Sequence, residues 1–419
     1  MKRRAFAWLA GVCGAGLALL AVVIGIELRA PALAPVQEPP PTDAALVARG
    51  AALARAGNCM ACHTARGGLP YAGGRRIETP FGDLVAGNLT PDPETGLGAW
   101  SRAAFARALH EGRSRDGRLL YPAFPYPQFT RLSEEDVDAL WAHLRSLAPV
   151  RQANGPHALR FPYRTQAALA VWRALFFEPG RFRPDPAQSA EWNRGAYLVQ
   201  GVAHCAACHG TRNGWGAITD TFGGEALPDG RWRAPSLHDP RQAGVQDWPA
   251  ERVLALLRDG RVEGASVAGP MAEVVLHGTQ YLPEPELRAM AAYLRALPRH
   301  APAPPAFVPA DRAVRDAGER LYGRHCADCH GRAGEGQAGA WPALAGNRVV
   351  TMDDPTNLLQ AIVGGGFAPA TRGHPEPYGM PPFRTLLQDA EIAAIASHLR
   401  QSWGHRASAV RAMDVQRVR

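Results

Sequence analysis

The sequence predicts a mostly α-helical chain in which one small unit is repeated three times. Three observations support this prediction. A Cys-x-x-Cys-His motif occurs three times, a short helical pattern precedes each copy, and an amphipathic helical pattern closes each unit. Few stretches alternate between apolar and polar residues as strands do. With 419 residues, the chain has room for about three domains.

The three units share helical patterns at both ends. The opening helices carry Gly50, Gly195 and Gly318, which precede the first cysteine of their motifs by 9, 10 and 8 residues. The closing helices place apolar residues at i, i+3 and i+7, which gives each helix one buried face. They are expected over residues 137–144, 287–294 and 392–399.

A middle helix also recurs, and several of its ends carry capping signals. It is expected from Trp100-Ser101 to Gly112, from Trp248-Pro249 to Gly260, and from Asp354-Pro355 onward. In the closing helices, Ser133 with Asp136 predicts an N-cap in the first unit, and Asp389 predicts one in the third.

Prolines and composition divide the chain between these units. We expect a signal segment or transmembrane anchor over 1–27, a Pro-rich stalk over 28–45, repeats over 46–148, 191–297 and 312–404, linkers over 149–190 and 298–311, and a tail over 405–419. The first linker contains an apolar helical stretch at 167–177.

The N-terminal segment predicts export and an uncleaved anchor. It is uncharged from Ala5 to Ile26, 22 residues, and follows Lys2-Arg3-Arg4. A helix of about 20 residues spans a bilayer, with its cationic end in the cytoplasm. A cleaved signal peptide is the alternative, but the nearest Ala-x-Ala, at 32–34, is followed by a proline. We interpret Cys13 in this segment as a small apolar residue.

The cysteine motifs predict three covalently attached haems. Two thiols three residues apart can form thioethers with the two vinyl groups of one porphyrin, and the next histidine then binds the iron. A redox Cys-x-x-Cys needs no histidine after it, and Cys₄ zinc sites would leave one of the three pairs over. The predicted fold is therefore three tandem class I-type cytochrome c domains. The haem-binding residues are Cys59, Cys62, His63, Cys205, Cys208, His209, Cys326, Cys329 and His330.

Two methionines are the expected sixth iron ligands. Met271 follows His209 by 62 residues, and Met380 follows His330 by 50 residues. Both have glycine and proline nearby, which favours a ligand loop over core packing, the alternative for any methionine. His/Met coordination raises the potential of a haem.

The first repeat lacks such a methionine. Phe124 follows Trp100 by 24 residues, much as Met271 follows Trp248 by 23, so a side chain that cannot bind iron occupies the ligand position. We expect an iron that is five-coordinate or bound by water or another neighbour. His110, at an exposed helix end, is a less favoured sixth ligand, and His143 is expected to be a packing residue.

The chain carries a formal charge of +8, from 46 basic and 38 acidic residues. Lys2 is the one lysine, and base-composition bias explains the many arginines as well as selection does. Three haems would bring about six propionates, which offset most of this charge. No basic run is interleaved with aromatic residues, so nucleic-acid binding is not expected.

Several further segments carry a family resemblance that covers nearly the whole chain from about residue 45 to 404. The chain resembles the membrane-bound three-haem cytochrome c subunits of bacterial periplasmic dehydrogenases. The resemblance rests on residues 49–63, 88–96, 121–126, 191–198, 271–275, 278–281 and 402–404.

This resemblance implies a partner and an electron acceptor. The partner would be a quinoprotein, a flavoprotein or a molybdenum hydroxylase, and the acceptor would be ubiquinone or a terminal oxidase, at the periplasmic side of the inner membrane. Phe124 within Pro-Ala-Phe-Pro-Tyr, with residues 223–225 and 232–235, looks more like the molybdenum-hydroxylase branch. Phe124 departs from the alcohol-dehydrogenase pattern, in which a methionine usually stands at this position.

Two other function classes compete with an electron-transfer subunit. An open first haem could reduce peroxide, although only Tyr121 and Tyr126 stand near Phe124 as acid or base candidates. A haem-based sensor or scaffold would need an output domain, and the sequence contains none. We therefore expect an electron-transfer subunit that is not itself an enzyme.

Overall fold

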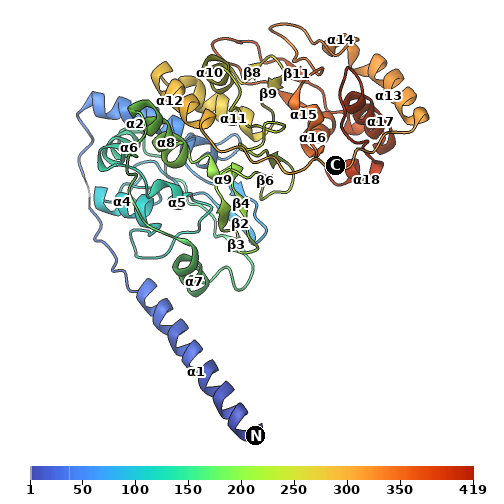
Figure 1. The fold of residues 1–419 in the computed structure, drawn as a ribbon. Helices are drawn as coiled ribbons and strands as arrows, with labels where there is room; N and C mark the ends of the chain where they lie inside the picture. The colour runs from blue at the N-terminus through green and yellow to red at the C-terminus, as the bar shows by residue number, and fades with distance from the viewer. Residues whose placement is uncertain (1, 37) are drawn as a thin grey trace.

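The computed structural model describes residues 2–36 and 38–419. Met1 of the predicted anchor and Gln37 of the predicted stalk lie outside this description. The long helix α1 (Lys2–Glu27) projects from a body of short helices (Figure 1). In the part of the chain that the structure describes, no helix combines the length and the apolar character that crossing a bilayer requires. The mostly helical fold is confirmed, whereas the predicted anchor is not.

Each repeat is built on a pair of helices that cross at a glycine. A Cβ on Gly50, Gly195 or Gly318 would lie 1.8, 1.9 or 2.1 Å from a backbone carbonyl oxygen of the partner helix, so only glycine permits this approach. The pairs are α2 (Ala44–Ala56) with α6 (Glu134–Ser146), α8 (Ala190–Tyr197) with α12 (Glu284–Arg295), and α13 (Arg312–His325) with α17 (Asp389–Gln401).

The predicted middle helices are present as α4 (Arg102–Glu111), α10 (Ala250–Asp259) and α16 (Thr356–Gly364), and most predicted caps are confirmed. Ser101 and Ser133 cap α4 and α6, each by accepting a backbone N–H. Gly112 and Gly260 end α4 and α10 in the left-handed conformation. The cap of α17 is Gln388 rather than Asp389, because Gln388 and Glu391 form a reciprocal capping box.

Short elements connect these helices. The remaining helices are α3 (Cys59–Cys62), α5 (Tyr126–Phe129), α7 (Gln166–Phe176), η1 (Leu198–Val202), α9 (Ala206–His209), α11 (Pro270–His277), η2 (Thr279–Tyr281), α14 (Ala327–His330), α15 (Arg348–Thr351), η3 (Phe383–Thr385) and α18 (Ala412–Gln416). One antiparallel sheet has the order β1 (Arg76–Ile77), β2 (Gly82–Val85), β3 (Ala158–Leu159). Four antiparallel pairs are β4 (Thr211–Arg212) with β5 (Ile218–Asp220), β6 (Glu225–Ala226) with β7 (Arg233–Ala234), β8 (Arg261–Val262) with β9 (Ala265–Ser266), and β10 (Gly366–Phe367) with β11 (Gly379–Met380).

The hydrophobic core is divided unequally among the repeats. One continuous cluster joins the first two repeats and includes Leu53, Trp141, Leu198 and Met290. The third repeat has a separate cluster around Tyr322. The first two repeats therefore share one core, whereas the third packs as its own body at the right of Figure 1.

Hydrogen bonds hold the third repeat against the second. Asn357 bonds to both the backbone N–H and the carbonyl of Arg233, at 2.9 and 2.8 Å. The guanidinium of Arg348 stacks 4.4 Å from the Trp248 ring and donates to the carbonyl of Gly244 at 2.6 Å. Residues 298–311, the second predicted linker, form no helix or strand.

The predicted stalk is wrong, because residues 28–36 and 38–43 lie against the first repeat. The Leu33 N–H donates to the carbonyl of Arg115 at 2.8 Å, and Arg107 donates to the carbonyl of Pro31, also at 2.8 Å. The carboxylate of Glu38 accepts from the Trp141 indole at 2.7 Å and from the Arg102 N–H at 2.9 Å. Proline keeps this segment extended, but these bonds prevent it from acting as a free spacer.

Two other predicted connections are also part of the folded body. In the first linker, β3 pairs with β2 of the first repeat, and the Val150 carbonyl accepts from Asn88 at 2.8 Å. In the predicted tail, Val410 and Val415 are buried against the third core, and Ser397 bonds to both backbone groups of Val410.

Candidate haem sites

Each Cys-x-x-Cys-His motif lies at the end of an opening helix, within a single helical turn. None of the seven cysteines forms a disulfide. Burial raises the pKa of the first thiol of each motif, to about 12 for Cys59 and Cys205 and to about 11 for Cys326. A reactive redox dithiol requires a lowered pKa, so these pairs do not have the electrostatic environment of a thioredoxin-type site.

Each of the three motif histidines makes the same kind of hydrogen bond to the backbone. The Nδ1 atoms of His63, His209 and His330 each bond to a backbone carbonyl, at 2.7, 2.7 and 3.0 Å; the acceptors are Gly87, Pro235 and Pro342. Because Nδ1 must carry the proton to donate, each Nε2 keeps its lone pair for a metal. Burial also lowers the pKa of all three side chains, which favours the neutral imidazole that binds iron.

These residues fit covalent haem attachment. Two free thiols on one turn and an imidazole in the Nε2-ligand tautomer are the donor set that haem c requires. Among the described residues, no three His, Cys, Asp or Glu side chains come together as a metal-binding group.

The two predicted methionine ligands lie beside glycines that are packed by aromatic rings. Met271 is at the start of α11 and is half-buried. Two residues earlier, a Cβ on Gly269 would lie 2.4 Å from the Trp232 ring, so only glycine fits there. Met380 is in β11, also half-buried, and the Phe367 ring would lie 2.8 Å from a Cβ on Gly379.

The structure gives Phe124 the same backbone register as Met271. The carbonyl of Gly112 accepts from the Leu120 N–H, and the carbonyl of Gly260 accepts from the Val267 N–H, both at 2.8 Å. Phe124 and Met271 each follow the donor of this bond by four residues. The Phe124 ring is half-buried and packs 5.6 Å from the Phe129 ring.

His110 is buried, which corrects the prediction of an exposed helix end. Its side chain lies beneath Glu134, with Nδ1 3.6 Å from a carboxylate oxygen, and Nε2 has no hydrogen-bond partner. Burial lowers the pKa of His110 to about 4. His143 packs edge-on against Tyr71 at 5.9 Å, and its Cβ faces Gly50 as that of Tyr293 faces Gly195.

The first two motifs are neighbours. The His204 ring, one residue before Cys205, hydrogen-bonds through Nε2 to the carbonyl of Gly57 at 2.9 Å. Burial raises the pKa of Cys208, Arg212 lowers it, and the charge of nearby Cys62 raises it further. The first two motifs are therefore neighbours in the fold, with Cys62 and Cys208 both at the surface.

Comparison with known proteins identifies the family. The Cytochrome c family matches residues 47–148 and 316–403. The chain is 37% identical to the cytochrome c subunit of alcohol dehydrogenase (quinone) of Gluconobacter oxydans, over 96% of this chain and 87% of that protein. It is 34% identical to the gluconate 2-dehydrogenase cytochrome c subunit of Pantoea cypripedii, over 96% and 94%. The chain belongs to the family of dehydrogenase cytochrome c subunits.

A third relative is much longer. The chain is 42% identical to a subunit of the nicotinate dehydrogenase of Pseudomonas putida, over 94% of this chain but only 33% of that protein. This match agrees with the molybdenum-hydroxylase features noted in the sequence. As a dehydrogenase cytochrome c subunit, the chain binds haem c covalently and transfers electrons rather than acting as the catalytic enzyme. The peroxidase alternative gains no support from these relatives.

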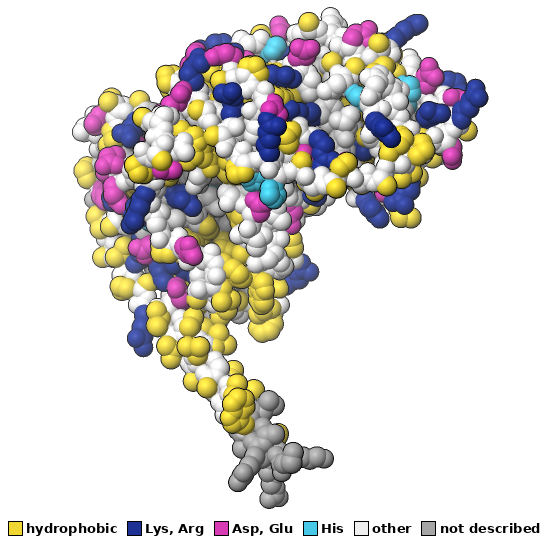
Figure 2. Space-filling model, in the orientation of Figure 1, with side chains coloured by type: hydrophobic (Ala, Val, Ile, Leu, Met, Phe, Trp, Pro, Cys, Tyr) yellow, Lys and Arg dark blue, Asp and Glu magenta, His cyan; other side chains and the backbone are white. Residues whose placement is uncertain are grey.

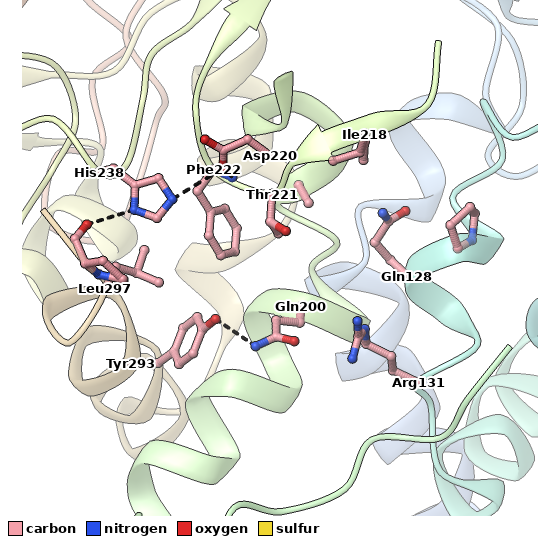
Figure 3. A pocket seen from close by; sticks show the side chains of 13 residues that line it. Gln128, Arg131, Gln200, Ile218, Asp220, Thr221, Phe222, His238, Tyr293 and Leu297 are labelled. Carbon is pink, nitrogen blue, oxygen red and sulfur yellow. Dashed lines mark hydrogen bonds and ion pairs between the residues drawn. The ribbon is translucent and has the colours of Figure 1, made fainter. Parts of the chain in front are cut away.

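Sequence reasoning missed two features of this cytochrome subunit. The first is His204, whose isolated position before a motif gives no sign of a contact with Gly57. The second is a cavity of about 330 Å³ between the first two repeats (Figure 3). In it, Tyr293 bonds to Gln200 at 2.7 Å and His238 lies 3.5 Å from Asp220. Its walls include Ala206 of the second motif but none of the predicted iron ligands.

Proposed function

We propose that the chain carries three haems and passes electrons from a dehydrogenase catalytic subunit to ubiquinone or a terminal oxidase. The observation that supports the count is the hydrogen bond from each motif histidine to a backbone carbonyl, repeated in all three motifs. When bound, each haem iron supplies a site that gains and loses one electron. The haem-binding residues proposed are the six motif cysteines and three motif histidines.

The protein's own part is to hold each iron in a chosen environment. The carbonyl of Gly87, Pro235 or Pro342 fixes the ring of its histidine, and the surrounding burial keeps that imidazole neutral. Met271 and Met380 would supply soft thioether ligands to the second and third irons. In the first repeat, the shared backbone register puts Phe124 at the position where such a ligand would stand.

Electron transfer between the first two sites is supported by their packing. Cys62 and Cys208 lie within reach of each other's charge, and His204 ties the second motif to Gly57 of the first. Two attachment sites fixed in one core give a constant separation, so no domain movement is needed for electrons to pass between them.

The proposed partner is a catalytic dehydrogenase subunit. Relatives are named as cytochrome subunits of alcohol, gluconate and fructose dehydrogenases, and one as a subunit of nicotinate dehydrogenase. A molybdenum hydroxylase is favoured, because both the Phe124 segment and the relative with 42% identity point to that branch. We place the complex at the periplasmic side of the inner membrane, with residues 1–27 as its anchor.

The haem count is tested by measuring iron and haem after export with a cytochrome c maturation system. Three haems per chain, each retained in denaturant, are expected; two would contradict the proposal. His330→Ala should reduce haem in the third repeat alone, whereas His325→Ala, a nearby histidine outside the motif, should leave the count at three.

The electron-transfer role is tested with the catalytic subunit co-expressed. Substrate should reduce all three haems only in its presence, and added ubiquinone or oxidase should reoxidise them. Turnover of an alcohol or N-heterocycle by the purified chain alone would contradict the role.

A further inference from the structure

A group of apolar side chains lies on the body next to the end of α1. Phe161 is 76% exposed, Leu175 64% and Trp215 59%. Leu175 belongs to α7, Phe161 is the first residue of the turn that leads into α7, and the Trp215 carbonyl accepts from the indole of Trp172 on α7 at 3.0 Å. We call these three residues the α7 patch. Figure 2 shows hydrophobic side chains gathered where α1 leaves the body.

The C-terminal end of α1 packs against the first repeat beside the α7 patch. The Glu27 carboxylate pairs with Arg113 at 2.8 Å and with Arg173 of α7 at 3.0 Å. Both guanidinium groups are about nine-tenths buried, with 11% and 7% of their side-chain areas exposed. Ile24, one turn earlier in α1, packs against buried Leu169 and Ala170 of α7.

These contacts tie α1 to the mature fold. Loss of residues 1–34 by cleavage would remove the carboxylate that pairs with both Arg113 and Arg173, and it would uncover the apolar face of α7 that Ile24 packs against. It would also expose the turn at Gly117, where a Cβ would lie 2.4 Å from the carbonyl oxygen of Ala30. The contacts therefore favour retention of α1 and set its direction relative to α7.

We propose that the α7 patch contacts the surface of the lipid bilayer that holds α1. The first repeat would then lie directly against the bilayer instead of being attached to it through α1 alone. This rests on the proposed membrane location. Three features favour lipid, rather than a protein, as the partner of the α7 patch. The α1 helix beside the patch exposes Leu17, Leu19, Val22 and Ile26, and the described chain does not cover them.

The other two features are composition and charge. The patch contains Trp215 and Phe161, and tryptophan and phenylalanine side chains beside an apolar helix are typical of the interfacial zone of a bilayer. Exposed Arg29, Arg160 and Arg164 lie in sequence next to α1 and α7 and provide positive charge for anionic headgroups. A protein partner on the same patch is the outcome that the experiment below distinguishes.

The test uses the full haem-loaded chain in nanodiscs containing phosphatidylglycerol. With Cys13 replaced by alanine, a spin label is placed at Leu175→Cys, at Phe161→Cys, or at the control Phe367→Cys. Phe367 is 73% exposed and lies in β10 of the third repeat. Collisions with dissolved oxygen and with a water-soluble nickel chelate are measured by electron paramagnetic resonance.

Labels at 175 and 161 should collide with nickel several-fold less than the label at 367, and more with oxygen. Equal nickel accessibility at all three positions in chains embedded in nanodiscs would overturn the docking proposal and leave the location intact. Failure of the wild-type chain to enter nanodiscs would overturn both. Protection of the patch that appears only after the catalytic subunit is added would assign it to a protein partner.

Retention of α1 is checked separately by the intact mass of the exported holoprotein. A mass that includes residues before Glu27 is expected. A new N-terminus near residue 35 would overturn the docking proposal, because the patch would then have no neighbouring helix.

Discussion

The first and second repeats share one core and one backbone plan, yet they differ where an iron would meet its sixth ligand. The same carbonyl-to-N–H bond closes the turn after the middle helix in both, and four residues later one repeat has Phe124 and the other Met271. The scaffold is therefore separable from the ligand that it presents. Within one rigid core, a single side chain can set the potential of each site.

Exchange of the ligand position should give the largest effect. Met271→Leu should lower the potential of the second haem by a few tenths of a volt, within the roughly 0.8 V range that axial ligands set. Phe124→Met should shift the potential of the first haem in the opposite direction, upward. Redox titration with visible spectroscopy measures both.

Carbon monoxide binding tests independently whether residue 124 occupies the sixth-ligand position of the first haem. The wild-type reduced protein should bind carbon monoxide at the first haem, and Phe124→Met should suppress it. Phe124→Leu is the matched control, because it changes the side-chain volume without adding a ligand. If Phe124→Met and Phe124→Leu behave alike, the shared register does not place residue 124 over the iron.

The second difference between the repeats is the N-terminal segment held by the first. Glu27→Gln should destabilise the protein by roughly 3–5 kcal/mol, because it leaves two buried guanidinium groups without a counter-charge. The exposed pair Glu94–Arg151 provides the control, and Glu94→Gln should cost at most about 1 kcal/mol. Urea denaturation of the holoprotein, followed by circular dichroism, measures both; equal losses would contradict the buried role of Glu27.

The third difference is a buried histidine at the end of α4, where the second repeat has Arg258. The folded-state pKa of His110, about 4, lies below the usual 6.5, so the unfolded chain binds a proton that the folded chain does not. This contribution is complete above pH 6.5 and is lost as the pH falls toward 4, by at most about 3 kcal/mol. The stability of wild type relative to His110→Gln should therefore decrease on acidification from about pH 7 to about pH 5. A difference that does not change with pH would rule out this titration.

The helix crossing is shared by all repeats and should give the smallest effect. Gly318→Ala places a Cβ 2.1 Å from the carbonyl oxygen of Ala394 and should cost about 1–3 kcal/mol. Gly323 lies in the same helix with nothing within 4 Å of its Cβ position, so Gly323→Ala should stabilise by about 0.5–1 kcal/mol. Thermal unfolding compares the two. Effects of the same sign would show that helix propensity, rather than the crossing, decides the outcome.

Local patterns in the sequence were enough to predict the helices and motifs. Ser101, Ser133, Gly112 and Gly260 act as caps through bonds to residues within one turn, so their roles can be read from a short window. The register of Phe124 against Met271 was also predictable, because the spacing from the middle helix is nearly the same in two copies of one unit.

Contacts between distant residues were not predictable in this way. Residues 28–45 resembled a stalk because their partners, such as Arg107 and Trp141, lie far away in the chain. His110 was expected to be exposed because its burial depends on how the start of α6 covers α4. The proximity of Cys62 and Cys208 depends on how the first two repeats pack, which neither motif encodes.

The contacts of Asn357 and Arg348 with the second repeat connect the last two repeats by a route other than the chain itself, so we expect the folded repeats to stay together without an intact connection. Their bonds to Arg233 and Gly244 join the two repeats directly, in addition to the bonds that residues 298–311 make to each of them. A single protease cut in that segment would leave two pieces that remain associated. The rate of electron transfer between the two pieces would then not depend on protein concentration, because the pieces stay in one complex as in an uncut chain.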